Sequence, residues 1–507
     1  MRAAAPRTIG RIAWVAGALT FVAHLVANPH YGFFRDELYF IICGFHPAWG
    51  YVDQPPLVPL SAAATQLFGH SLVLLRAIPA LLAGAAVVAA CALAVELGGG
   101  AFAQTVTAIV VALSPVLLSF GMKVSTDEAN PLLWTLAALG ALRVVHGRDP
   151  RWWLLAGGSL GIALETKYSA AFFAVALVLA LLLTPERRAM RTRWFAIAIG
   201  LCVILALPSV VWQWSEGLPM LELLRAGQNG KNVIVGPAVY LLQEVLITGA
   251  LFALVWIAGL VRLAADRSAR FLALAWALLI AMMIALHGKH YYPAAVYPIP
   301  FAAGCVALEA WTRRVRLLRP AVAVVLAASG LSLAPLVLPV LPERDAVAYE
   351  LRVMHAGHVP EEALQTEHGR TATLDPDFAD MHGWPRLAAT VERAVATLPP
   401  NDRARAVIVA SNYGEASALD FFGRGLPPVI SGHNEYYLWG THGRSGDVLI
   451  DVNGDCGAGS GVFAHARRLA TFDDPWAIAW ERHIPIMLCE GIRTPLAVLW
   501  PRKREFR

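Results

Sequence analysis

Residues 33–40, FFRDELYF, place one cation beside two adjacent carboxylates in an otherwise apolar setting. The stretch comes directly after the first long apolar segment of the chain, and the sequence DQPPL follows at residues 53–57. Charge near a lipid bilayer is costly, so charges that are kept there mark a pathway, a binding partner or chemistry. This loop is therefore the first candidate for a functional site.

The composition around this loop is that of a polytopic membrane protein. Of 507 residues, 57% are hydrophobic and only 15% are charged, and the mean hydropathy is +0.55. Apolar runs recur, most of them close to the ~20 residues that a helix needs to cross a bilayer. They predict about 11 spans, at residues 9–29, 76–97, 101–121, 128–146, 151–166, 168–184, 194–213, 237–261, 270–287, 293–312 and 319–341.

The basic residues predict the orientation of these spans. The net charge of +5 does not indicate nucleic-acid binding, because most basic residues fall in short loops between spans, where they set topology. With the N-terminus inside, the inner segments carry Arg2, Arg7, Arg11, Arg148, Arg151, Arg187, Arg188, Arg191, Arg193, Arg262, Arg267, Arg270, Arg313, Arg314, Arg316 and Arg319. The outer loops of the membrane part carry only Arg35, Arg76, Lys123, Lys167, Arg225, Lys231 and Lys289. We therefore expect a bacterial cytoplasmic (inner) membrane protein whose first loop and C-terminal region face the periplasm or cell exterior.

The chain changes character at about residue 342, where charged residues and Gly become frequent and no further span follows. We divide it into a membrane domain, 1–341, with a first outer loop at about 30–75, and a soluble extracytoplasmic domain, 342–507. Within the second domain, apolar patterns predict helices at 384–399 and 412–422 and strands at 405–410, 448–452 and 484–489, and hence an α/β fold. Cys456 and Cys489 form a disulfide in an oxidising compartment or remain two unpaired thiols.

Two interpretations of Arg35, Asp36 and Glu37 are open from spacing alone. A carboxylate here can take a proton from an acceptor group, while the neighbouring cation keeps it ionised or binds a phosphate. The structural alternative is an interfacial salt bridge that anchors the loop.

Three further polar clusters are predicted on the same outer face. STDEANP at residues 125–131 contains a second acidic pair, ETKY at 165–168 contains a lysine between two short apolar segments, and HGKHYYP at 287–293 combines basic and aromatic side chains. The side chains of interest are Asp127, Glu128, Lys167, Lys289, His290, Tyr291 and Tyr292. Taken singly, these clusters are helix caps, snorkelling lysines and an aromatic belt. Their convergence on one face favours one shared site, in which the cations and His290 hold a phosphate and the tyrosines stack on a sugar.

Polar and aromatic residues of the C-terminal region need a separate interpretation. Asn412, Tyr413 and Glu415 follow a predicted strand, which is where α/β domains bind ligands. His433 and Glu435 lie in a second cluster of the kind that binds sugars. A tightly packed turn is the structural alternative for both clusters, and it is favoured slightly over direct contact with a substrate.

In these motifs the sequence resembles the GT-C superfamily of membrane glycosyltransferases. The nearer likeness is to the bacterial, family 39-like branch similar to protein O-mannosyltransferases and the lipid A aminoarabinose transferase. It rests on the first-loop acidic pair, DQPPL at 53–57, TDE at 126–128, TKY at 166–168 and KHYYP at 289–293. The resemblance covers about residues 10–340, whereas the C-terminal region does not resemble the domains of the O-mannosyltransferases.

The resemblance implies a polytopic α-helical GT-C fold and an inverting transfer of a sugar from a polyprenyl-phosphate donor to an envelope lipid, glycan or protein. It implies Asp36 as the base with Glu37 beside it, Asp127 and Glu128 as the second acidic motif, and Lys167, Lys289 and Arg35 as candidates for the carrier phosphate. It assigns no metal ligands and no resident cofactor, and leaves a divalent cation open. The expected partners are the lipid-linked donor, the acceptor and membrane lipids, with no nucleic acid.

Two other functions compete with a transferase. A transporter or flippase of lipid-linked saccharides would favour paired repeats and charges near the middle of the membrane, whereas the charges here cluster at one face. A non-catalytic membrane scaffold that presents the C-terminal domain would not depend on Asp36.

Overall fold

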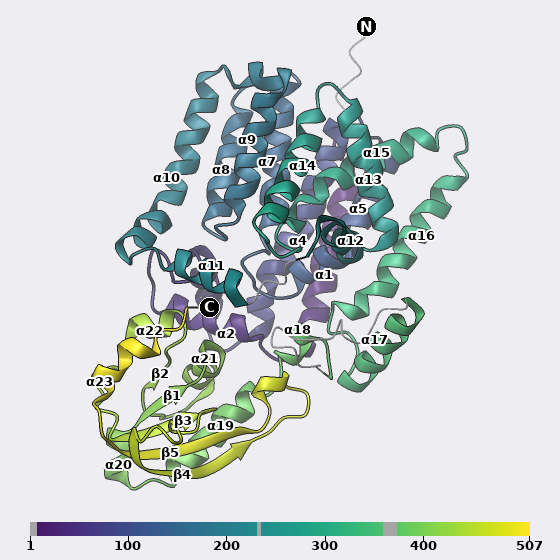
Figure 1. Cartoon of the computed structure of the whole chain (residues 1–507). Helices are drawn as coiled ribbons and strands as arrows, with labels where there is room; N and C mark the ends of the chain where they lie inside the picture. Colours follow the sequence, from purple (N-terminus) through teal and green to yellow (C-terminus); the bar gives the residue numbers. More distant parts are fainter. Residues whose placement is uncertain (1–7, 231–234, 358–372, 507) are drawn as a thin grey trace. The chain divides into compact units, whose positions relative to one another are not determined.

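The computed structural model describes residues 8–230, 235–357 and 373–506, and separates into two compact units (Figure 1). The helical unit contains the described parts of residues 1–29, 73–212 and 232–340. The loop–tail unit contains 30–72, 213–231 and 341–507 as far as they are described. The first outer loop thus groups with the C-terminal region, which we call the tail. Arg2, Arg7 and Lys231, which the topology prediction used, lie outside the described residues.

The helical unit is a bundle of apolar helices. In chain order these are α1 (Arg11–Ala27), α4 (Leu72–Glu96), α5 (Ala101–Leu113), α6 (Pro115–Met122), α7 (Asn130–Val145), α8 (Trp152–Leu164), α9 (Ala170–Leu183), α10 (Arg193–Ser215), α12 (Pro237–Thr248), α13 (Ala250–Ala265), α14 (Arg270–Ala285), α15 (Pro298–Trp311) and α16 (Leu318–Leu333). Every predicted span overlaps one or two of them. Among the described residues, five helical segments are long and apolar enough to cross a membrane.

Two predicted spans are broken helices. The chain bends by 60° between α5 and α6, because Pro115 has no backbone N–H to continue the hydrogen bonding of α5. α12 and α13 meet at 113° around Gly249, whose φ of 89° favours glycine. Counting each pair as one span raises the number of membrane-length segments to seven, and α7, α8, α9 and α14 are shorter apolar helices.

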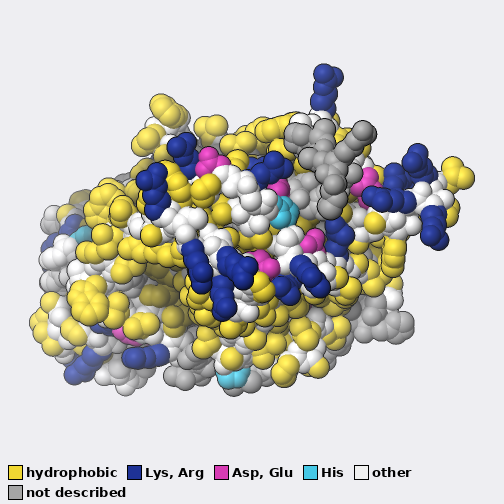
Figure 2. Space-filling view, turned by 90° about the horizontal axis from the view of Figure 1, so that it is seen from above, with side chains coloured by type: hydrophobic (Ala, Val, Ile, Leu, Met, Phe, Trp, Pro, Cys, Tyr) yellow, Lys and Arg dark blue, Asp and Glu magenta, His cyan; other side chains and the backbone are white. Residues whose placement is uncertain are grey.

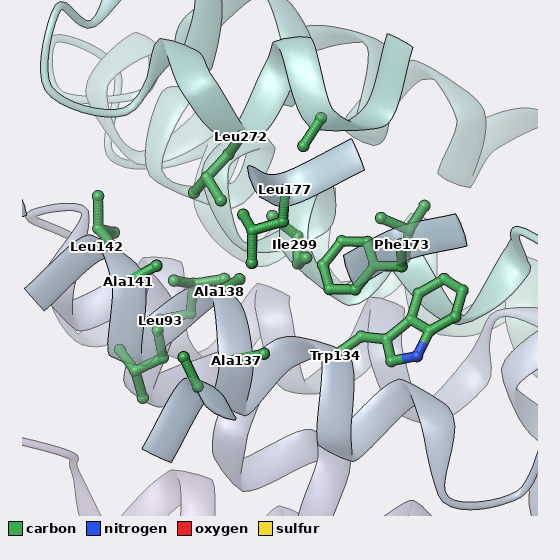
Figure 3. Packing of buried hydrophobic residues seen from close by; sticks show 14 of the residues in the cluster. Leu93, Trp134, Ala137, Ala138, Ala141, Leu142, Phe173, Leu177, Leu272 and Ile299 are labelled. Carbon is green, nitrogen blue, oxygen red and sulfur yellow. The ribbon is translucent and has the colours of Figure 1, made fainter. Parts of the chain in front are cut away.

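Large aromatic and small residues alternate in the core of the helical unit. Trp134 of α7 stacks on Phe173 of α9 with ring centroids 4.6 Å apart, next to a row of alanines on α7 (Figure 3). α13 and α15 approach so closely that a Cβ at Gly259 would lie 1.8 Å from the carbonyl oxygen of Pro300. Small residues at helix contacts let backbones pack closely, which is how helices associate in a membrane.

The loops predicted to face the cytoplasm meet at one end of the helical unit. Arg143 Nε lies 3.5 Å from Glu96 Oε2, Arg262 donates to the Leu97 carbonyl at 3.0 Å, and Arg270 pairs with Glu186 at 3.6 Å. Figure 2 shows the molecule from above, where Lys and Arg side chains gather among apolar ones. The helical unit therefore has a basic end, as the positive-inside pattern predicts.

The loop–tail unit is built on a five-stranded sheet. Its strands are β1 (Val407–Ala410), β2 (Val429–Ile430), β3 (Val448–Val452), β4 (Phe463–Phe472) and β5 (Ile484–Ile492), in the order β2-β1-β3-β5-β4. β1 runs parallel to β2 and β3, while β5 runs antiparallel to β3 and β4. The helices are α2 (Arg35–Phe45), α3 (Leu57–Thr65), α11 (Pro219–Gly230), α17 (Glu343–Gly357), α18 (Pro376–Ala379), α19 (Trp384–Ala396), α20 (Pro400–Arg405), α21 (Tyr413–Phe422), α22 (Glu435–Trp439) and α23 (Leu496–Leu499).

The predicted α/β elements of the tail are present, with two corrections. The strand predicted from residue 405 begins at Val407, because residues 400–405 form the short helix α20 with Pro400 in its first turn. β4 was not predicted, since this edge strand is largely exposed and carries charged residues that hide its pattern. Cys456 and Cys489 form a disulfide, which connects β5 to the segment after β3.

Candidate functional site

Glu37 shapes the start of the first-loop helix. Its side chain is fully buried, and Oε2 accepts a hydrogen bond from the backbone N–H of Phe34 at 2.8 Å. A carboxylate in the first turn satisfies an otherwise unpaired N–H and complements the helix dipole. The neighbouring Asp36, by contrast, has a side chain that is 35% exposed. The two acidic residues therefore have different environments, and Asp36 is the more accessible one.

The tail contacts Arg35 and Asp36 of the first loop. Tyr413 donates its hydroxyl to Asp36 Oδ1 at 2.7 Å. Arg35 lies 3.8 Å from the same carboxylate oxygen and 3.4 Å from Asp380 Oδ2, and its guanidinium lies over the rings of Tyr413 and Trp480 at 5.4 and 5.8 Å. Arg35 is therefore already engaged by an anion and by aromatic rings of the tail.

Asp53, the first residue of DQPPL, is held in a second set of contacts beside this one. Its carboxylate accepts from the Tyr39 hydroxyl at 3.0 Å and from Asn434 Nδ2 at 3.2 Å. Burial, with a smaller contribution from the nearby Asp36, raises the pKa of Asp53 to about 6, although the hydrogen bonds from Tyr39 and Asn434 lower it. A carboxyl that titrates close to neutral pH is suited to take up and release a proton.

Glu435 connects the tail to the DQPPL segment. Its Oε2 accepts from the backbone N–H of Val52 at 2.9 Å, and its own N–H donates to the Tyr39 hydroxyl at 3.2 Å. Burial raises the pKa of Glu435 to about 8, so this carboxyl is largely protonated at neutral pH. The cluster that includes Tyr413, Asn434 and Glu435 is therefore more than a packed turn of the tail, because its side chains contact the first loop.

The position of Tyr413 follows from the sheet. β1 lies between its parallel neighbours β2 and β3, and the connections of β1 and β3 leave toward opposite edges of the sheet. The carboxyl end of a strand at such a switch point is where α/β sheets bind ligands. Asn412 caps α21 there, accepting from Glu415 N–H at 3.0 Å, and Tyr413 is the next residue. The strand-loop-helix pattern could find this edge, but no local signal indicates its contact with residue 36.

The helical unit brings together a second group of predicted residues. Lys167 Nζ pairs with Asp127 Oδ2 at 2.5 Å, and both side chains are largely buried, at 17% and 10% exposed. The same ammonium lies 4.6 Å from the ring centroid of Tyr292 and 5.5 Å from that of Tyr291. This places ETKY, the second acidic motif and HGKHYYP in direct contact. The Lys167 ammonium thus lies between a carboxylate and two aromatic rings.

Lys289 and His290 belong to the same segment. Lys289 Nζ lies 5.9 Å from the Tyr291 ring centroid, and its carbonyl accepts from the Tyr240 hydroxyl at 3.3 Å. Burial lowers the pKa of His290, and the positive charge of Lys289 lowers it further. His290 is therefore neutral at pH 7 and can offer one hydrogen-bond donor and one acceptor.

Glu128, the second carboxylate of the TDE motif, is buried at the turn before α7. It is 4% exposed, accepts from the backbone N–H of Ser125 at 3.2 Å, and lines a small cavity with His24 and Pro131. These contacts fix the turn before α7, so this carboxylate stabilises the segment that carries Asp127.

One cluster in the described residues has the composition of a metal site, namely Asp451, Cys456 and Cys489. The two cysteine sulfurs are bonded to each other, so neither is a free thiolate ligand. The cluster is therefore a disulfide beside a carboxylate.

Comparisons with known proteins agree with this architecture. The profile of the family described as dolichyl-phosphate-mannose-protein mannosyltransferase matches residues 53–212, a range that includes Asp53, Asp127 and Lys167. The fold of the whole chain is similar to crystal structures of ArnT from Cupriavidus metallidurans, in the apo state and bound to undecaprenyl phosphate. Each has a TM-score of 0.60 and 14% sequence identity, over 94% of this chain and 97% of that one. An oligosaccharyltransferase from Archaeoglobus fulgidus is more distant, with a TM-score of 0.45, 15% identity, and 88% and 68% of the two chains covered. No curated protein sequence matches the chain.

The fold is the one seen in ArnT, and this likeness together with the family match over residues 53–212 supports the resemblance to GT-C glycosyltransferases that the motifs predicted. Its apolar helices are those of a multi-pass membrane protein, and its tail adds a small sheet.

Proposed function

We propose that the protein is an integral-membrane glycosyltransferase that moves a sugar from a polyprenyl-phosphate donor to an envelope acceptor, with inversion. The observation that carries this proposal is the match of nearly the whole chain to a GT-C fold, 94% of it, together with the family match over residues 53–212. One of the similar crystal structures, that of ArnT, contains undecaprenyl phosphate. This supports a lipid carrier for the sugar here.

The helical unit offers the groups for the donor phosphate. In the proposal, Lys167 and Lys289 bind the carrier phosphate and stabilise the negative charge that develops as it leaves. Asp127 holds the Lys167 ammonium at 2.5 Å, and Tyr291 and Tyr292 flank it. Their rings suit stacking against a sugar face, and His290 adds a neutral hydrogen-bonding group.

The first loop offers the base. An acceptor oxygen attacks the anomeric carbon, the bond from this carbon to the phosphate oxygen breaks, and the acceptor proton passes to Asp36. The phosphate leaves on its lipid carrier, so no covalent sugar–enzyme intermediate is needed. We assign Glu37 to the start of α2, because it accepts from Phe34 N–H, and Arg35 to the contact between loop and tail.

We further propose that the first loop and the tail face the periplasm of a bacterial cell. The basic end of the helical unit supports a cytoplasmic position for the loops at that end. The Cys456–Cys489 disulfide supports an oxidising compartment for the tail. Labelling with a membrane-impermeant maleimide, applied to a cysteine introduced at the exposed Phe68 and in parallel at the exposed Leu317, tests this orientation. Labelling of intact cells at position 68 alone supports it, and labelling at position 317 alone contradicts it.

A saccharide transporter is the second candidate, and the two broken helix pairs are the observation in its favour. The two functions differ in whether a covalent bond is made. Purified protein in liposomes, supplied with the polyprenyl-linked lipids of a strain that lacks the gene, should transfer sugar to envelope acceptor material. Movement of unaltered lipid-linked saccharide without any transfer would instead support the transporter.

The carrier is testable without knowing the sugar. Native mass spectrometry of the purified protein with undecaprenyl phosphate should detect a bound adduct, and Lys167→Met should weaken it by about a hundredfold if the cation contacts the phosphate. Adduct of equal intensity with the wild type and with Lys167→Met would remove this residue from the proposed phosphate site.

A further inference from the structure

The hydrogen bond from Tyr413 to Asp36 joins two residues that are 377 positions apart in the sequence. It connects the first residue of α21 with the first turn of α2. The Tyr413 hydroxyl lies 2.7 Å from Oδ1, which is the length of a strong bond to a carboxylate. One carboxylate oxygen of the proposed base is thus held by the tail, while the Asp36 side chain keeps 35% of its surface exposed.

The ring of Tyr413 is held on several sides. It packs against Tyr39 with centroids 4.5 Å apart and against His433 at 4.8 Å, and the Arg35 guanidinium lies 5.4 Å from its centroid. Its backbone N–H donates to His433 Nδ1 at 3.4 Å. A side chain fixed in this way can orient a reacting group without reorganising during the reaction.

The residue after Tyr413 has to be small for Arg35 to reach this place. A Cβ at Gly414 would lie 2.3 Å from Arg35 Cγ and 2.6 Å from Cδ, so any larger residue would displace the arginine or the helix. The start of α21 is therefore shaped to receive the Arg35-Asp36 pair.

The hydroxyl of Tyr413 stays a donor over the physiological range. Burial raises the pKa of this phenol well above its ordinary value, and the Asp36 carboxylate raises it further, against the lowering effect of Arg35. A phenol that keeps its proton cannot itself take the acceptor proton at neutral pH. Its role toward Asp36 is therefore to hold and stabilise the ionised carboxylate.

We infer that Tyr413 is a positioning residue for Asp36, and that the switch-point edge of the C-terminal α/β domain is thereby an integral part of the catalytic site. The inference rests on the proposed function, because it assigns a partner to the proposed base. The tail is then part of the catalytic site. The segment at the carboxyl end of β1 binds the Asp36 side chain, at the position where other α/β domains bind ligands.

The test compares two tyrosines that differ in what their hydroxyls touch. Tyr413→Phe removes the hydroxyl bound to Asp36, and Tyr436→Phe is the matched control. Tyr436 is also buried and donates to an aspartate, Asp420, at 2.7 Å, but this pair lies within the tail. Full-length variants in liposomes receive polyprenyl-linked lipid extract from a strain that lacks the gene, and sugar transfer is followed by mass spectrometry as a function of donor amount and pH.

We expect Tyr413→Phe to lower the maximal rate by about 10- to 100-fold, the value of one hydrogen bond to a charged group, with little change in the half-saturating amount of donor. Its pH–rate profile should also differ from that of the wild type, because the carboxylate has lost a hydrogen-bond donor. Tyr436→Phe should keep both the rate and the profile of the wild type.

The outcomes separate this inference from the proposed function. A Tyr413→Phe rate and pH profile equal to those of Tyr436→Phe, with Asp36→Asn inactive, would overturn the inference and leave the proposed base. Full activity of Asp36→Asn would overturn the base itself. Should Tyr413→Phe fail to accumulate, trifluorotyrosine incorporated at position 413 retains the ring but has a more acidic hydroxyl. The transfer rate of this variant should fall as pH rises through the pKa of the trifluorinated phenol, because the ionised phenol no longer donates to Asp36. An unchanged pH–rate profile would refute the inference.

Discussion

Removal of the Cys456–Cys489 disulfide should loosen the tail sheet by a calculable amount. The bridge connects two cysteines that are 33 positions apart, one in β5 and one after β3. In the chain-entropy description, closing a loop of this length stabilises the fold by about 4 kcal/mol. Since each 1.4 kcal/mol is about tenfold, local opening of β3 and β5 should become about a thousandfold more frequent in a Cys456→Ala, Cys489→Ala variant.

Hydrogen exchange of the full-length protein in detergent measures this opening directly. Peptides from Val448–Val452 and Ile484–Ile492 should exchange far faster in the double variant, whereas peptides from the helical unit should not change. Cys305→Ala is a matched control, because this buried free cysteine lies in α15 outside the tail. If both strands of the double variant exchange at the wild-type rate, the disulfide has no stabilising role. If both thiols of the wild-type protein are alkylated without reductant, the bridge does not form.

Three further perturbations test the two units. Lys167→Met should reduce sugar transfer at least about a hundredfold, while Lys167→Arg retains part of the rate, in a liposome assay at saturating donor. Gly414→Ala should displace Arg35 and lower the transfer rate. Gly227→Ala in α11 is the control and should keep the rate, because a Cβ there would meet nothing within 4 Å. Equal rates for the two variants would argue against the close packing at Gly414. Glu435 has a pKa raised to about 8 in the folded protein, so the folded state holds a proton that the unfolded state releases above about pH 4.5. Its contribution to stability is therefore complete at low pH and declines as pH rises toward 8, and Glu435→Gln should flatten this part of the pH–melting curve measured by thermal unfolding.

Much of the fold could be predicted because its signals are local. A bilayer demands apolar helices, and each predicted segment overlaps one or two of them, although several are shorter than a full span. The broken spans were less predictable, because a kink at Pro115 or Gly249 leaves the apolar pattern intact. β4 was not predicted, because an exposed edge strand with charged side chains has no alternation of apolar and polar residues.

The candidate site was predictable only as separate motifs. Spacing identified Asp36 and Glu37 as a pair, but only the fold shows that one caps a helix and the other meets a tyrosine. The pairing of Asp127 with Lys167 likewise depends on how α7 and α8 pack, which no local pattern encodes. Contacts between distant segments, such as that of Tyr413 with the first loop, arise from tertiary structure and are the part that sequence reasoning misses.

In the proposed reaction the protein transfers a sugar, and Asp36 takes the acceptor proton. The most direct measurement is mass spectrometry of envelope lipids, glycans and proteins from a strain that lacks the gene, complemented with the wild type or with Asp36→Asn at equal membrane levels. We expect the wild type to restore a mass increment of one sugar residue on an acceptor, and Asp36→Asn not to restore it. The same increment with both, or no difference between the strain with and without the wild-type gene, would contradict this proposal.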